Sequence, residues 1–105
     1  MEEILIVEDE RDIREILSFN LERAGYRTVE ASTAEEGLEK LTQSTSLILL
    51  DVMLPGMSGF EMASTIREAD SHVPIIFLTA RSSEEDVLNG FKSGGDDYIA
   101  KPFSR

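Results

Sequence analysis

The sequence has no cysteine, no tryptophan and no long apolar run. Without cysteine the chain cannot form disulfides, and no segment resembles a signal peptide, so we expect a reducing, cytoplasmic setting rather than secretion. Its longest apolar runs, residues 4–7, 47–50 and 75–78, are each four residues long. A membrane span needs about 20 apolar residues, so we expect a soluble protein without membrane contact.

Basic residues are also scarce, with 10 lysines and arginines against 21 aspartates and glutamates and a net charge of -11. An acidic surface repels phosphate backbones, which argues against direct nucleic-acid binding by this domain. The length of 105 residues fits one compact domain. We therefore predict a single domain over residues 1–105, with no effector domain.

Three apolar segments do not alternate with polar residues, which is typical of strands covered on both faces of a parallel sheet. They are residues 4–7, 47–50 and 74–78. Residues 27–31 alternate and suit an edge strand, and residues 98–100 suit a short fifth strand.

Apolar residues recur at helical spacing between these segments. The first predicted helix carries Ile13, Ile16, Leu17, Leu21 and Ala24 and stops at Gly25; the second carries Ala34, Leu38 and Leu41, with Ser32 or Thr33 as its cap; the third carries Phe60, Met62, Ala63 and Ile66; the fourth runs from about Ser83 to Gly94 and Gly95. Strands alternating with helices predict an α/β fold with helices on both faces of the sheet.

Polar residues follow the predicted strands where each one ends. Glu8 and Asp9 follow the first, Asp51 the third, Thr79 the fourth and Lys101 the fifth. Parallel strands end at one edge of a sheet, so we expect these residues to meet there. Each alone could be a helix cap or a solvated side chain. Together they indicate a site for a hard cation, Mg²⁺ with Mn²⁺ as the other option, and for a phosphoryl group.

The chemistry expected of such a site is phosphoryl transfer to a carboxylate. Three neighbouring carboxylates repel one another unless a cation intervenes. With the cation bound, one carboxylate can attack a phosphoryl group while Lys101 and the metal stabilise charge on the transferred oxygens. Thr79 could then donate a hydrogen bond to the product.

Four segments resemble, in order, the motifs of bacterial response regulator receiver domains, the CheY-like domains of two-component systems. They are residues 6–10 (IVEDE), 50–59 (LDVMLPGMSG), 78–81 (LTAR) and 94–103 (GGDDYIAKPF). The resemblance covers essentially the whole chain. It implies a flavodoxin-like, doubly wound sheet of five parallel strands in the order 2-1-3-4-5.

The resemblance also implies a role for each residue of the site. Asp51 would accept phosphate from a sensor histidine kinase or phosphotransfer protein, and Glu8, Asp9, Asp51 and the backbone carbonyl of Met53 would surround Mg²⁺. Lys101, in an expected cis peptide with Pro102, would pair with the phosphoryl group, while Thr79 moves towards it and Tyr98 turns inward. These movements would alter the surface that an output domain or partner reads. Such a domain catalyses only its own phosphorylation and dephosphorylation and is not a turnover enzyme.

The sequence departs from the family pattern at three places, one of which is Gly95, where relatives more commonly carry alanine. Ser58 stands where relatives often carry aspartate, and either residue can cap the third helix. Receiver domains also continue into a fifth helix after the motif that ends at Phe103, whereas the sequence ends at Arg105. If these residues were the entire molecule, we would expect a homo-oligomer in which a second copy covers the face that this helix usually covers.

Two other functions remain open from the sequence. In aspartyl-phosphate phosphatases an acid typically follows two residues after the nucleophile, but that position here is Met53. A pseudo-receiver would bind partners without being phosphorylated. Measuring the intact mass of the chain after treatment with acetyl phosphate and Mg²⁺ distinguishes these two functions from a phosphorylation switch. The sequence does not identify the cognate kinase, the stimulus or the output.

Overall fold

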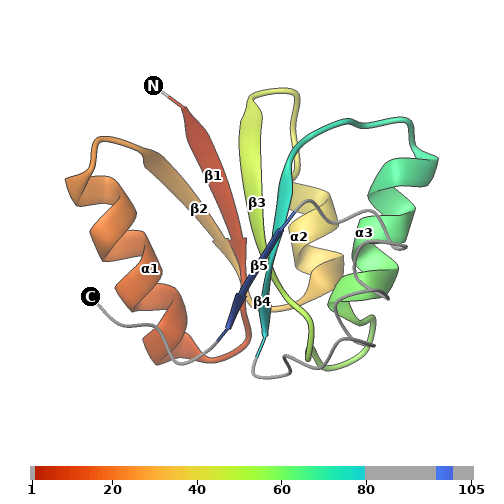
Figure 1. Cartoon of the computed structure of the whole chain (residues 1–105), viewed down its shortest axis with the longest axis horizontal. Helices are drawn as coiled ribbons and strands as arrows, with labels where there is room; N and C mark the ends of the chain where they lie inside the picture. The colour runs from red at the N-terminus through yellow and green to blue at the C-terminus, as the bar shows by residue number, and fades with distance from the viewer. Residues whose placement is uncertain (1, 80–96, 101–105) are drawn as a thin grey trace.

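A five-stranded parallel sheet forms the centre of the fold (Figure 1). The computed structural model describes residues 2–79 and 97–100, with Thr79 and residues 97–100 described by their backbone only. The elements are β1 (Glu3–Val7), α1 (Arg11–Arg23), β2 (Arg27–Ala31), α2 (Ala34–Lys40), β3 (Thr45–Asp51), α3 (Gly59–Glu68), β4 (Ile75–Thr79) and β5 (Asp97–Ala100). The predicted fourth helix lies outside the described residues.

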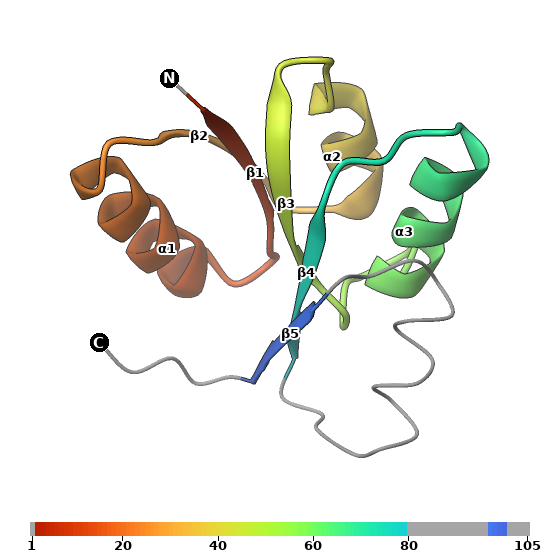
Figure 2. The ribbon, with the colours of Figure 1, turned by 45° about the horizontal axis from the view of Figure 1, so that its top comes forward.

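The strand order β2-β1-β3-β4-β5 and the parallel pairing of every neighbouring pair confirm the predicted flavodoxin-like topology. The alternating segment β2 lies at an edge, as expected. Helix α1 covers one face of the sheet, and α2 and α3 cover the other (Figures 1 and 2). The sheet is therefore doubly wound.

Unbroken apolar strands supply two cores because successive side chains point to opposite faces of the sheet. On the α2 and α3 face the core includes Leu5, Val7, Ile48, Leu50, Ile75 and Phe77 from the strands, with Ala34, Met62, Ala63 and Ile66 from the helices. On the α1 face it includes Ile4, Ile6, Leu49 and Leu78, with Leu17 and Leu21 packed against them. This burial on both faces explains why the strands carry no polar alternation.

The helix ends follow local chemistry. Gly25 has a φ of 100° and ends α1, and the next N–H, of Tyr26, donates to the Leu21 carbonyl in a Schellman motif. Of the two candidate caps of α2, Thr33 is the one used, since its hydroxyl accepts from the Glu36 N–H at 3.0 Å. Ser58 caps α3, as predicted, in a capping box with Glu61.

The carboxyl ends of the neighbouring strands β1 and β3 form the topological switch point of the sheet. From β1 the chain passes through α1 on one face to β2, and from β2 it reaches β3 through α2 on the opposite face. Ligands of open parallel sheets bind where the connections diverge in this way. Among residues 2–79 and 97–100, no helix is long and apolar enough to cross a membrane.

Candidate acidic site at the sheet edge

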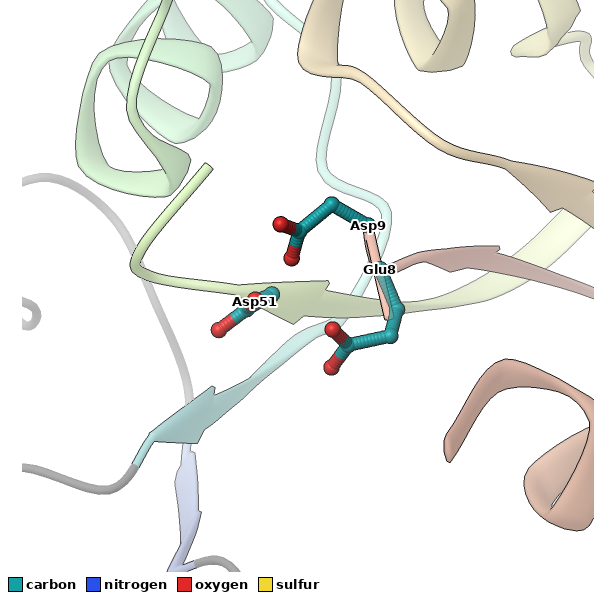
Figure 3. Close-up of side chains that lie close together, drawn as sticks. All are labelled: Glu8, Asp9 and Asp51. Carbon is teal, nitrogen blue, oxygen red and sulfur yellow. The ribbon is translucent and has the colours of Figure 1, made fainter. Parts of the chain in front are cut away.

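Three carboxyl groups meet at the ends of β1 and β3 (Figure 3). Glu8 and Asp9 directly follow β1, and Asp51 is the last residue of β3. Each contributes an oxygen that lies within 4.8 Å of the others. The structure thus brings together the three acids that the strand ends predict.

The three acids differ in exposure. Glu8 is fully buried and Asp51 is 2% exposed, whereas Asp9 is exposed. The Glu10 N–H donates to Glu8 Oε2 at 3.0 Å, and the Met53 N–H donates to Asp51 Oδ1 at 3.3 Å. Two carboxylates are therefore oriented by the backbone, and the third faces water from the rim.

Helix α3 begins against the backbone that carries Asp51. The Gly59 N–H donates to the Val52 carbonyl at 3.1 Å, and the Val52 N–H donates to the Leu78 carbonyl at 3.1 Å. A Cβ atom at Gly59 would overlap the carbonyl oxygen of Asp51. Only glycine permits this approach of α3 to the end of β3.

Beside the acids lies an ion pair that sequence reasoning missed. Arg14, in the first turns of α1, donates from Nη1 to the Glu8 carbonyl oxygen at 2.7 Å and from Nε to Glu30 Oε1 at 3.1 Å. The two side chains lie 16 positions apart on different elements. The only signal in the sequence was the alternation of residues 27–31, which could have assigned Glu30 to the α1 face.

A second group of polar contacts links α2 to β2. Glu36 accepts from the Ser32 N–H at 2.7 Å and pairs with Lys40 at 3.0 Å. The hydrogen bond from the Ser32 backbone, then that from Lys40, lowers the pKa of Glu36 from 4.5 to about 2. Lys40 Nζ also donates to the Glu30 carbonyl oxygen at 2.6 Å. This end of β2 is therefore fixed by α2 as well as by Arg14.

The other predicted site residues are described only in part. The backbone pairing of Thr79 with Ala100 places the ends of β4 and β5 at the same edge as Asp51. The Thr79 and Tyr98 side chains, Lys101 and its peptide bond to Pro102 lie outside what the structure describes. Met53 is exposed, with 59% of its surface accessible.

The donor set fits a hard divalent cation. All three side chains offer carboxylate oxygens, the ligands that Mg²⁺ and Mn²⁺ prefer, and their separation allows one ion to contact all of them. Asp9 is exposed, so solvent reaches this end of the sheet. Such access suits Mg²⁺, which usually keeps several water ligands when a protein binds it. The single histidine of the sequence, His72, lies in the connection between α3 and β4, where its side chain is 91% exposed, and it does not belong to this cluster.

Comparison with known proteins gives one family. The family model "Response regulator receiver domain" matches residues 4–105. The transcriptional regulatory protein YrkP of Bacillus subtilis is 48% identical over 101 residues, which cover 96% of this chain and 43% of that protein. The regulator of alkaline phosphatase synthesis PhoP, from the same species, is 46% identical over 102 residues, with 96% and 42% covered. The chain thus spans less than half the length of these curated relatives.

Solved structures agree with the sequence comparison. The chemotaxis protein CheY4 of Vibrio cholerae superimposes with a TM-score of 0.93 at 32% identity, covering 99% of this chain and 89% of that one. The response regulator DrrB of Thermotoga maritima gives a TM-score of 0.88 at 38% identity, covering 98% of this chain and 46% of that one.

Proposed function

Because this chain belongs to the response regulator receiver domain family, we propose that it is a phosphorylation switch whose phosphate acceptor is Asp51. The observation that carries the proposal is the meeting of Glu8, Asp9 and Asp51 within 4.8 Å at the switch point of the sheet. Of the three, Asp51 ends β3, is nearly buried and is oriented by the Met53 N–H.

The proposed reaction is the transfer of a phosphoryl group to Asp51. One of its carboxylate oxygens attacks the phosphorus of a phosphohistidine, an O–P bond forms and the P–N bond breaks. The leaving imidazole takes the bond electrons, so the products are an aspartyl phosphate and a neutral imidazole after proton balance with solvent. Glu8, Asp9, Asp51 and the Met53 carbonyl are the proposed ligands of Mg²⁺, which when bound supplies positive charge to the phosphoryl oxygens.

The remaining roles rest on family membership. We assign Lys101 to the phosphoryl oxygens and Thr79 and Tyr98 to the switch that carries phosphorylation to the surface. The partners proposed are a cytoplasmic histidine kinase or phosphotransfer protein and an output domain. Because the similar proteins are transcriptional regulators, we propose transcription as the output, with DNA contacts made outside this acidic domain.

Intact mass tests the switch directly. After incubation with acetyl phosphate and Mg²⁺ we expect one added phosphate on the parent and none on Asp51→Asn. No addition to the parent would support a pseudo-receiver instead. Steady turnover of a phosphomonoester would support the phosphatase reading and contradict a self-limited switch.

Calorimetry tests the metal site separately. We expect Mg²⁺ to bind weakly without phosphate, because most of its ligands would be water and three carboxylates. Asp9→Ala should abolish the binding signal. Asp12→Ala is the matched control, since it removes an exposed aspartate of the first turn of α1 and the same charge. Equal titrations of the two variants would contradict the proposed ligand set.

A further inference from the structure

Arg14 contacts the acidic site through the backbone of Glu8 rather than through a carboxylate. Its Nη1 donates to the Glu8 carbonyl at 2.7 Å and its Nε donates to the Glu30 carboxylate at 3.1 Å. The Arg14 side chain is 18% exposed, whereas that of Arg11, one turn earlier on the same helix, is 80% exposed and pairs only with Glu15 in the contacts described. Arg14 is therefore built into the fold in a way that Arg11 is not.

The bond from Arg14 fixes the peptide group that joins two proposed ligands. The Glu8 carbonyl lies in the same plane as the Asp9 N–H, so holding that oxygen sets the direction in which the chain leaves for Asp9. On its other side, the Glu8 N–H donates to the Ala31 carbonyl at 3.0 Å. Both backbone groups of Glu8 are thus held, and the side chain of Glu8 in turn accepts from the Glu10 N–H.

The far end of this contact is itself anchored. Glu30 pairs with Ile6 in the register of β1 and β2, and its carbonyl accepts from Lys40 of α2. A guanidinium offers several N–H donors in a rigid plane, so one side chain can hold the Glu8 carbonyl and the Glu30 carboxylate at once. The result is a link from the fixed end of β2 to the turn that carries the acids.

We propose that Arg14 is a positioning residue that holds the turn from Glu8 to Glu10 in the shape required for divalent cation binding, with Glu30 as its anchor. The proposal deepens, and for its metal dependence rests on, the proposed phosphorylation switch. A positioning role and a purely electrostatic role of Arg14 predict opposite changes in Mg²⁺ affinity when the side chain is removed. Removing a cation beside an acidic site would by charge alone tighten Mg²⁺ binding, whereas loss of positioning would weaken it.

The experiment compares Arg14→Ala with Arg11→Ala, which removes the same charge from the same helix. We expect Mg²⁺ affinity, measured by calorimetry, to fall about tenfold in Arg14→Ala, the range seen when a partner of a metal ligand is lost, and to stay at the parent value in Arg11→Ala. Phosphorylation by acetyl phosphate should need more Mg²⁺ in Arg14→Ala but approach the parent rate at saturation. Well below the melting temperature, general destabilisation would not raise the Mg²⁺ requirement while leaving the rate at saturating Mg²⁺ unchanged.

A second readout does not depend on the metal. Amide hydrogen exchange at Glu10 should be faster in metal-free Arg14→Ala than in metal-free Arg11→Ala, because the turn has lost its anchor. If Arg14→Ala does not fold, Arg14→Lys replaces it, since one ammonium keeps the charge but loses the planar fork and should give an intermediate Mg²⁺ affinity.

The outcomes separate the two proposals. Unchanged or tighter Mg²⁺ binding in Arg14→Ala, or parent behaviour in Arg14→Lys, would overturn the positioning role while leaving the switch in place. A parent that neither binds Mg²⁺ nor gains phosphate would overturn the switch and the metal-dependent role together. Glu10 exchange equal in the two alanine variants would overturn the positioning role whether or not the switch holds.

Discussion

Asp51 combines burial with the proximity of two other carboxyl groups. Its oxygen lies within 4.8 Å of oxygens of Glu8 and Asp9, so these charges oppose the folded state when no cation is present. Asp51→Asn should therefore raise the free energy of unfolding in EDTA by roughly 1 to 2 kcal/mol. It should also lose most of the stabilisation that Mg²⁺ gives the parent.

Urea denaturation with EDTA and with Mg²⁺ measures both effects of Asp51→Asn. Asp12→Asn is the control, because Asp12 is an exposed acid outside the cluster. A full Mg²⁺ response in Asp51→Asn would remove Asp51 from the proposed ligand set.

Met53 lies two residues beyond the proposed acceptor, with its side chain exposed and its N–H bonded to Asp51. A thioether is only a weak hydrogen-bond acceptor, so it cannot orient a water for attack on the phosphoryl group. We expect a long-lived phosphoryl group in the parent and several-fold faster loss in Met53→Asn. Met53→Leu should decay like the parent in the same intact-mass time course. Slower or unchanged loss in Met53→Asn would contradict this account.

At the scale of elements, the first residue of α3 packs against the backbone of Asp51 and so helps to fix the position of this residue. An added Cβ at Gly59 would overlap the Asp51 carbonyl, so α3 or the end of β3 must move in Gly59→Ala. We expect a loss of about 2 to 3 kcal/mol in the free energy of unfolding. Gly25→Ala meets nothing within 4 Å and should cost about 1 kcal/mol, for its φ of 100° alone. If urea denaturation gave equal losses for Gly59→Ala and Gly25→Ala, the contact between residue 59 and the Asp51 carbonyl would tolerate a side chain.

Glu36 of helix α2 makes the stability of the folded chain depend on pH. Its pKa falls to about 2 in the folded chain from an ordinary 4.5, so its contribution is complete above pH 4.5 and is lost as the pH falls towards 2. Because the Glu36 side chain is 38% exposed, solvent screens its interactions, and we expect it to contribute only about 0.5 to 1 kcal/mol to the free energy of unfolding.

The variant Glu36→Gln measures this contribution in urea at a series of pH values. It should be less stable than the parent at pH 7, and the difference should shrink as the pH falls from about 4.5 towards 2. Glu39→Gln, an exposed change of the same charge on the same helix, is the control. A difference that grows on acidification would have the wrong sign for this mechanism.

At the scale of the whole chain, the 105 residues carry a net charge of -11, with 10 basic against 21 acidic residues. Mutual repulsion of this size opposes a compact state, and salt screens it over about 10 Å at 0.1 M. Raising NaCl from about 0.05 to 0.5 M should therefore increase the free energy of unfolding in EDTA by about 1 kcal/mol. Potassium chloride should act alike. A decrease would mean that pairs such as Arg14 with Glu30 outweigh the repulsion.

The sequence by itself determined the elements and their approximate ends. Apolar runs and helical spacing are local signals, and they predicted all five strands and the first three helices. Because parallel strands end together, the positions of Glu8, Asp9 and Asp51 after such runs were enough to predict their meeting. Gly25 could likewise be recognised as the end of α1, since a left-handed residue is most easily glycine.

Only the tertiary structure decided which side chains hold that meeting in place. Arg14 and Glu30 belong to separate elements, and their contact depends on how α1 packs across β2. The burial of Glu8 beside an exposed Asp9 depends on the direction in which the chain leaves β1. The need for glycine at position 59 arises because α3 starts against the backbone of β3. Local spacing cannot encode these features, because each is a distance between segments that the fold alone brings together.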